Sequence, residues 1–118
     1  MTSLSSLIPR LRDRALQGTM VRDEQGHYIY GAPIGHFQAV LTSRQERVGE
    51  DYRLFILEAE TKALLLNIKV KGSMVCLEYV DAEKVSGLHQ ALENPRGHRG
   101  DNWTDYCRIL QNAYCPEG

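Results

Sequence analysis

The side chains with the most varied chemistry lie together in one short stretch, NPRGHRGDNWTDYC, residues 94–107. Asn94 and the proline after it end one expected helix. Asn102 and Asp105 have the spacing of a helix-capping pair, and their oxygens would occupy the amide groups that a phosphate needs. The tripeptide RGD within the stretch is too short to indicate cell adhesion. The basic side chains that remain suit a phosphate or a partner's carboxylate. They are Arg96, His98 and Arg99.

A second candidate for binding is the charged segment RQERVGED, residues 44–51. It mixes acidic and basic groups, which is typical of a surface that selects a protein partner rather than one that grips a polyanion. The candidate partner-binding residues of this loop are Arg44, Glu46, Arg47, Glu50 and Asp51.

Basic residues also accompany two of the expected strands, 52–60 and 63–71. A basic sheet face with aromatic rings holds single-stranded nucleic acid in some folds, so nucleic-acid binding is the alternative function. Solvated lysines are the simpler interpretation, because Phe55, Leu57 and Leu65 would share this face. The candidates for nucleic-acid binding are Arg53, Lys62, Lys69 and Lys71.

Two histidines, His27 and His36, flank a glycine-rich segment, residues 31–35, and imidazole is the usual general base near neutral pH. No serine or cysteine motif supplies a nucleophile there. A small enzyme that uses His27 or His36 is therefore a second alternative, and we expect no enzymatic activity and no catalytic residue.

Neither a metal nor a cofactor is predicted. Structural zinc ligands come in pairs two to four residues apart, and the histidines and cysteines lack this spacing. No phosphate-binding loop or dinucleotide motif is present. The three cysteines have no disulfide spacing, and no segment has the apolar length of a signal peptide or a membrane span. We expect a cytoplasmic protein that does not bind membranes.

The elements that must position these groups follow from apolar periodicity. Residues Leu4 to Ala15 repeat at helical spacing and predict an amphipathic helix. Ser6 is its expected N-cap, which would place Pro9 in the first turn, and Gly18 is the expected left-handed stop. A second helix is predicted over 82–93 with Asp81 as its N-cap, and a last helix over 103–114. The second helix should bury Ala82, Val85, Leu88 and Leu92.

Alternation of apolar and polar residues predicts strands between the first two helices. Gly26 suits the turn of the first hairpin, and residues 31–35 are expected to form a rigid connection rather than a strand. Leu64, Leu66, Ile68 and Val70 should share the core face. Met74 to Val80 is apolar on both faces, which places it inside the sheet. The predicted strands are 19–22, 27–30, 36–43, 52–60, 63–71 and 74–80.

The short connections require antiparallel pairing. We therefore expect a single α+β domain, residues 1–118, with an antiparallel meander sheet of five or six strands. One N-terminal helix precedes the sheet, and two C-terminal helices pack on it.

Composition narrows the function. The net charge of -1 gives no overall field that would draw the molecule to a polyanion, and the 42% hydrophobic content is ordinary for a globular protein. The expectation is a small non-enzymatic protein-binding module, such as an inhibitor or adaptor of the kind that bacterial immunity proteins and antitoxins represent. Its partner is then another protein, and an edge strand could also pair two copies into a homodimer.

Overall fold

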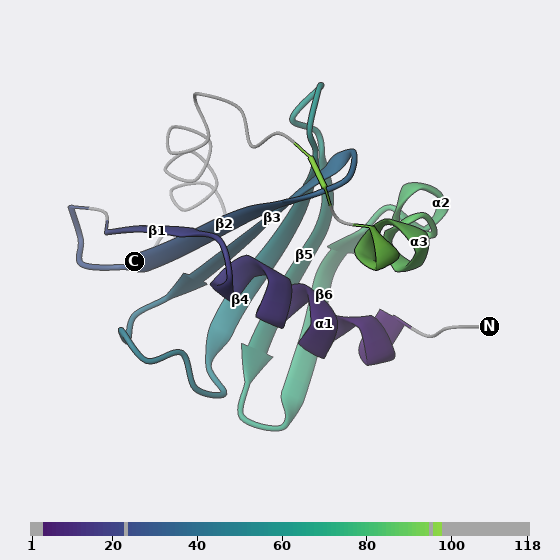
Figure 1. The fold of residues 1–118 in the computed structure, drawn as a ribbon. Helices are drawn as coiled ribbons and strands as arrows, with labels where there is room; N and C mark the ends of the chain where they lie inside the picture. Colours follow the sequence, from purple (N-terminus) through teal and green to yellow (C-terminus); the bar gives the residue numbers. More distant parts are fainter. Residues whose placement is uncertain (1–3, 23, 95, 98–118) are drawn as a thin grey trace.

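The computed structural model of the protein describes residues 4–22, 24–94 and 96–97. Among these residues, the helices pack on one face of an antiparallel sheet of six strands (Figure 1). Helix α1 (Leu4–Leu16) precedes the sheet, and α2 (Ala82–Val85) and α3 (Leu88–Glu93) follow it. The strands are β1 (Thr19–Arg22), β2 (Tyr28–Ile34), β3 (Phe37–Ser43), β4 (Tyr52–Glu58), β5 (Leu64–Lys71) and β6 (Met74–Val80). The predicted α+β meander is confirmed.

The strands lie side by side in sequence order, so β1 and β6 form the two edges of the sheet. The prediction that Met74 to Val80 lies inside the sheet is wrong. A meander adds each strand beside the one before it, so the last described strand pairs only on its inner side, with β5, among the residues that the structure describes. Apolar residues on both faces of β6 therefore do not mean that it is enclosed, and six of its seven residues are exposed.

Strand β2 extends through the glycine-rich segment that was expected to be a rigid connection, and that prediction is also wrong. Gly31 pairs with Val40, and Pro33 pairs with Gln38. Proline is tolerated there because β1 begins at Thr19, opposite Gly31, and does not reach position 33, where β2 pairs only with β3 among the described strands. Arg14 of α1 uses this opening, and its Nε donates to the Pro33 carbonyl at 3.0 Å.

Helix α1 begins earlier than its expected N-cap, at Leu4, so Ser6 and Pro9 both lie inside the helix. Proline there removes one backbone hydrogen bond of the helix. Gly18 does not adopt the predicted left-handed conformation, since its φ is not among the positive values. Glycine is required at position 18 because the backbone there passes very close to β2. An added Cβ at Gly18 would lie 2.0 Å from the Gly31 carbonyl oxygen.

The helix predicted over 82–93 is broken in two at Ser86 and Gly87. Its N-cap is confirmed, because the Asp81 side chain accepts a hydrogen bond from the Lys84 amide. Val85 and Leu88 are buried as predicted, whereas Ala82 is exposed and Leu92 is half-buried. The predicted helix over 103–114 lies outside the described residues.

The sheet has two apolar faces, here called front and back. The front face carries the larger cluster, in which Leu41, Leu54 and Ile68 pack against Leu11 of α1. The back face carries a smaller cluster of buried residues: Ile29, Val40, Phe55 and Leu57.

A bulge in β5 changes which side chains reach which face. Ile56 pairs with Leu66 but Leu57 pairs with Leu64, so Leu65 is the extra residue. Leu65 therefore packs in the front cluster and Leu64 against the back cluster. The predicted strict alternation of these two side chains is wrong, because a bulge shifts the pattern by one residue.

Tyr52 gives the fold a measurable response to alkaline pH. Burial raises the pKa of its phenol above the ordinary value of 10.0, Arg12 opposes this rise and Asp13 adds to it. The folded state therefore holds the proton more tightly than the unfolded state. This stabilisation is complete below pH 10.0 and is lost as the pH rises through the folded-state pKa.

We expect the Tyr52→Phe variant to lose less stability above pH 10.0 than the parent protein. Urea unfolding in steps from about pH 8 to about pH 11 measures this. Parallel stability curves for the two proteins over that range would contradict the expectation.

Candidate functional site

Strand β6 is the most exposed apolar part of the described sheet. Its large side chains remain accessible to solvent at 73% for Met74, 47% for Val75, 51% for Leu77 and 46% for Tyr79. Among the described residues no strand pairs with the outer side of β6, so backbone N–H and C=O groups are unpaired along it. We use the name β6 edge for the outer side of β6, with its unpaired backbone groups, together with the exposed side chains of Met74 to Tyr79.

Local interactions hold the start of β6 in place. Gly72 supplies the tight turn between β5 and β6 with a φ of 61°. The Asp51 carboxylate accepts a hydrogen bond from the Gly72 amide at 2.9 Å. Natural edge strands are usually protected from pairing by lysine or other charges, proline, a bulge or shortness. Strand β6 has seven residues with no lysine and no proline, and its protection is limited to Glu78, its only charged residue, which lies at a bulge.

The register assigns the side chains of β6 to the two faces. Val75 and Leu77 pair with front-face residues of β5, whereas Met74 and Cys76 pair with Lys71 and Lys69 on the back. Between Leu77 and Tyr79 the strand bulges, because Ile68 pairs with Leu77 and Asn67 with Tyr79. Glu78 is the extra residue of this bulge.

The extra residue is held by a hydrogen-bonded row on the back face. Arg53 Nη1 donates to Glu78 Oε2 at 2.7 Å and to Asn67 Oδ1 at 3.1 Å. The Arg53 side chain is only 12% exposed, so this ion pair is shielded from water better than a surface pair. The row joins side chains of β4, β5 and β6.

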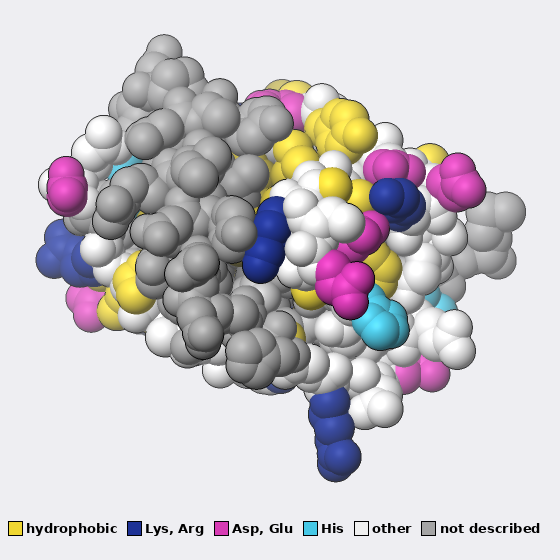
Figure 2. Space-filling view, turned by 90° about the horizontal axis from the view of Figure 1, so that it is seen from above, with side chains coloured by type: hydrophobic (Ala, Val, Ile, Leu, Met, Phe, Trp, Pro, Cys, Tyr) yellow, Lys and Arg dark blue, Asp and Glu magenta, His cyan; other side chains and the backbone are white. Residues whose placement is uncertain are grey.

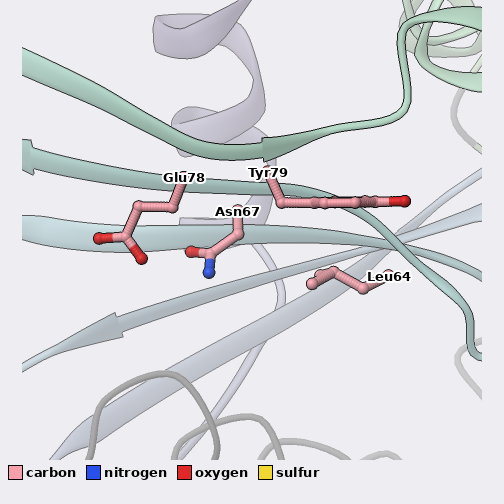
Figure 3. Close-up of a pocket in the computed structure, with 4 residues that line it drawn as sticks. All are labelled: Leu64, Asn67, Glu78 and Tyr79. Carbon is pink, nitrogen blue, oxygen red and sulfur yellow. The ribbon is translucent and has the colours of Figure 1, made fainter.

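A pocket of about 450 Å³ opens on this face beside the row. It is lined by Leu64, Asn67, Glu78 and Tyr79, whose side chains project from the same side of β5 and β6 (Figure 3). Leu64 and the Tyr79 ring give it apolar walls, and Glu78 and Asn67 give it polar atoms. A pocket of this kind suits one side chain of a docked protein segment.

The predicted partner-binding residues fall at two separate places. The charged loop 44–51 follows β3, and its candidate residues are all exposed. Arg12 Nη2 donates to the Val48 carbonyl at 3.0 Å, and the Tyr30 hydroxyl donates to the Glu46 carbonyl at 3.0 Å, which anchors this loop. Asp51 is committed to the turn before β6.

The other predicted partner-binding residues belong to the basic loop. Arg96 is exposed, and its neighbour Gly97 lies against Gly35 in the connection before β3. The connection lies at the opposite end of β3 from the charged loop, about 23 Å away at 3.3 Å per residue. His98 and Arg99 lie outside the described residues.

The predicted nucleic-acid candidates are also divided. Arg53 and Lys69 are directly paired, and Lys71 follows on the same face. Lys62 lies in the β4–β5 turn, at the other end of β5. Arg53 is engaged by Glu78. The aromatic ring expected on this face, Phe55, is 0% exposed, so it offers no surface on which a base could stack.

The two histidines considered for catalysis are placed at opposite ends of β2. His27 directly precedes this strand and is buried at 4% exposure, whereas His36 follows it and is exposed. The structure therefore does not bring them into one site. Gln38 also lies on the back face, with a buried side-chain amide whose Nε2 and Oε1 have no hydrogen-bond partner among the residues that the structure describes.

The end of the sheet that carries α2 and the β4–β5 turn has both acidic and basic side chains. Acidic and basic side chains are interspersed there among apolar ones (Figure 2), and Lys84 pairs with Glu58 at 3.3 Å. Among the described residues at this end of the sheet, charges of one sign do not gather into a patch.

Within the described ranges, no three histidine, cysteine or acidic side chains lie close enough together to hold a metal ion. None of the helices in that part of the chain is long and apolar enough to cross a membrane. Comparison with family models, curated proteins and solved structures found no match.

The β6 edge is the functional candidate that sequence reasoning missed. The apolar residues on both faces of β6 were the available signal, and they were interpreted as burial. An apolar strand is buried when it has neighbours on both sides and can be an interface when it lies at an edge. Strand β6 lies at an edge because it is the last strand of the described meander.

Proposed function

We propose that this protein is a small non-enzymatic protein-binding module that docks its partner along β6. The observation that carries the proposal is the exposure of Met74, Val75, Leu77 and Tyr79 on one strand whose outer side pairs with no other described strand. A partner strand added there gains backbone hydrogen bonds along β6, and its side chains cover the exposed apolar surface.

The arrangement of the site supports a binding role rather than catalysis. Arg53, Asn67 and Glu78 lie on the back face beside the β6 edge, and Arg53 donates a hydrogen bond to each of the other two. Side chains that are already restrained in this way lose less conformational freedom when a partner docks. An inhibitor or adaptor, as immunity proteins and antitoxins are, is the narrower form of the proposal.

Affinity capture with a matched pair of variants tests the proposal. The tagged parent protein should retain a protein partner in stoichiometric amount, and Leu77→Lys should lose it because a cation then faces the apolar contact. Met20→Lys makes the same change on the opposite edge strand, β1, where Met20 is 42% exposed, and should retain the partner. Equal retention by all three proteins would contradict docking along β6.

Nucleic-acid binding is the outcome to exclude in the same experiment. Retention of single-stranded DNA that falls steeply with salt and disappears in the Lys69→Glu/Lys71→Glu variant would support that alternative. We expect neither effect, because Arg53 is already paired and Phe55 is buried.

A further inference from the structure

We infer that the strand that docks on β6 is β6 of a second copy, paired antiparallel about a two-fold axis at Cys76. This inference rests on the proposed docking role of the β6 edge and names its occupant. The resulting dimer would have one continuous sheet that runs through both chains.

The faces of β6 select the register. A two-fold axis perpendicular to the sheet places front-face residues opposite front-face residues. With the axis at Cys76, Val75 lies opposite Leu77 of the second copy, and both belong to the front face. With the axis at Leu77, Val75 would lie opposite Tyr79, which belongs to the back face because of the bulge. Cys76 is therefore the centre that matches faces along Met74 to Glu78.

The charges of β6 agree with this register. Glu78 would lie opposite Met74 of the second copy, so the two Glu78 carboxylates are about 13 Å apart along the strands. Met74 pairs within its own chain with Lys71. Each Glu78 therefore faces an apolar side chain, with Lys71 in the next strand on the same face, and meets no like charge, which favours this pairing.

On the back face, this axis brings the exposed Met74 side chain of each copy to the pocket of the other. Met74 is the most exposed large apolar side chain, at 73%, and the pocket of about 450 Å³ lies beside Glu78 and Tyr79 on the same face. Opposite residues of paired strands have Cβ atoms about 5 Å apart, so Met74 of each copy reaches the pocket of the other. Methionine is flexible and fills irregular apolar gaps well. The pocket walls in Figure 3, Leu64 and Tyr79, suit its thioether.

The mass of the protein in solution tests the inference. Sedimentation velocity of the parent protein should give the mass of two chains. Met74→Glu removes the side chain that enters the pocket and places a carboxylate opposite Glu78 of the second copy, so the dissociation constant should rise at least about tenfold. The same glutamate lies beside Lys71 of its own chain, which favours the folded single chain. Met20→Glu on β1 is the matched control and should remain a dimer.

Cross-linking tests the register in the Cys107→Ser/Cys115→Ser background, in which Cys76 is the only cysteine. A short bismaleimide should link two chains through Cys76. When the cysteine is moved by Cys76→Ser and Ser73→Cys, the two thiols lie about 20 Å apart along the strands, and the link should not form.

The outcomes separate this inference from the proposed function. If the parent protein is a single chain at every concentration, a second copy does not dock on β6. If cysteines at positions 76 and 73 cross-link equally, the proposed pairing about Cys76 is also wrong. If Leu77→Lys still abolishes capture of a different protein in either case, docking along β6 stands. If it changes nothing, both proposals fall.

Discussion

Replacing Gly18 with alanine should destabilise the protein by about 3 kcal/mol, the upper range for overpacking a well-packed site. The new Cβ would lie 2.0 Å from the Gly31 carbonyl oxygen and 2.8 Å from the Ala32 Cβ. Gly31 pairs with both β1 and β3, and Ala32 pairs with Ala39 of β3, so neither atom can move without distorting the sheet. The chain must therefore shift where α1 passes into β1.

Thermal and urea unfolding measure the effect. Gly49→Ala is the matched control, because nothing lies within 4 Å of an added Cβ there and its φ is not positive. That change should be neutral or stabilising by up to about 1 kcal/mol, through the lower entropy of the unfolded chain. If Gly18→Ala unfolds at the same urea concentration as the control, the close approach to Gly31 is wrong.

Phe55→Ala should have the other large effect, a loss of about 3 to 5 kcal/mol in the free energy of unfolding. The Phe55 side chain is 0% exposed and is the largest of the back cluster. Its removal takes away apolar contacts and leaves a cavity that Val40 and Leu57 fill only in part. The back cluster is then shown to be a second core of the sheet.

Lys69→Ala is the control on the same face, since Lys69 is exposed and lies opposite Arg53. Its effect should stay within about 0.5 kcal/mol. A similar small loss for Phe55→Ala would mean that the back face contributes little to stability and that Phe55 is accessible.

Most of the fold could be predicted from local signals. Alternation fixed the strands, and Gly26 with its φ of 89° closes the first hairpin as expected. The failures occurred where tertiary packing overrides such signals. Gly31 and Pro33 are poor strand residues, but β3 pairs with them along the whole segment. Ser86 and Gly87 interrupt a helix that had a continuous apolar stripe.

The candidate site was less predictable, because it depends on two bulges and on strand order. The extra residues Leu65 and Glu78 shift side chains to faces that strict alternation does not give. Arg53 is a candidate for nucleic-acid binding in the alternative function, yet its side chain bonds to the carboxylate of Glu78, 25 residues later in the chain. No spacing rule finds such a pair before the register is known.

The hydrogen bond between Asp51 and the Gly72 amide has a thermodynamic consequence. It connects the end of the charged loop to the turn that starts β6. A ligand of the charged loop that draws Asp51 away would loosen that turn and weaken docking at the β6 edge. By reciprocity of linked equilibria, an occupied edge must oppose that ligand by the same free energy. Binding at the charged loop and binding at the β6 edge would therefore weaken each other, although the two surfaces do not overlap.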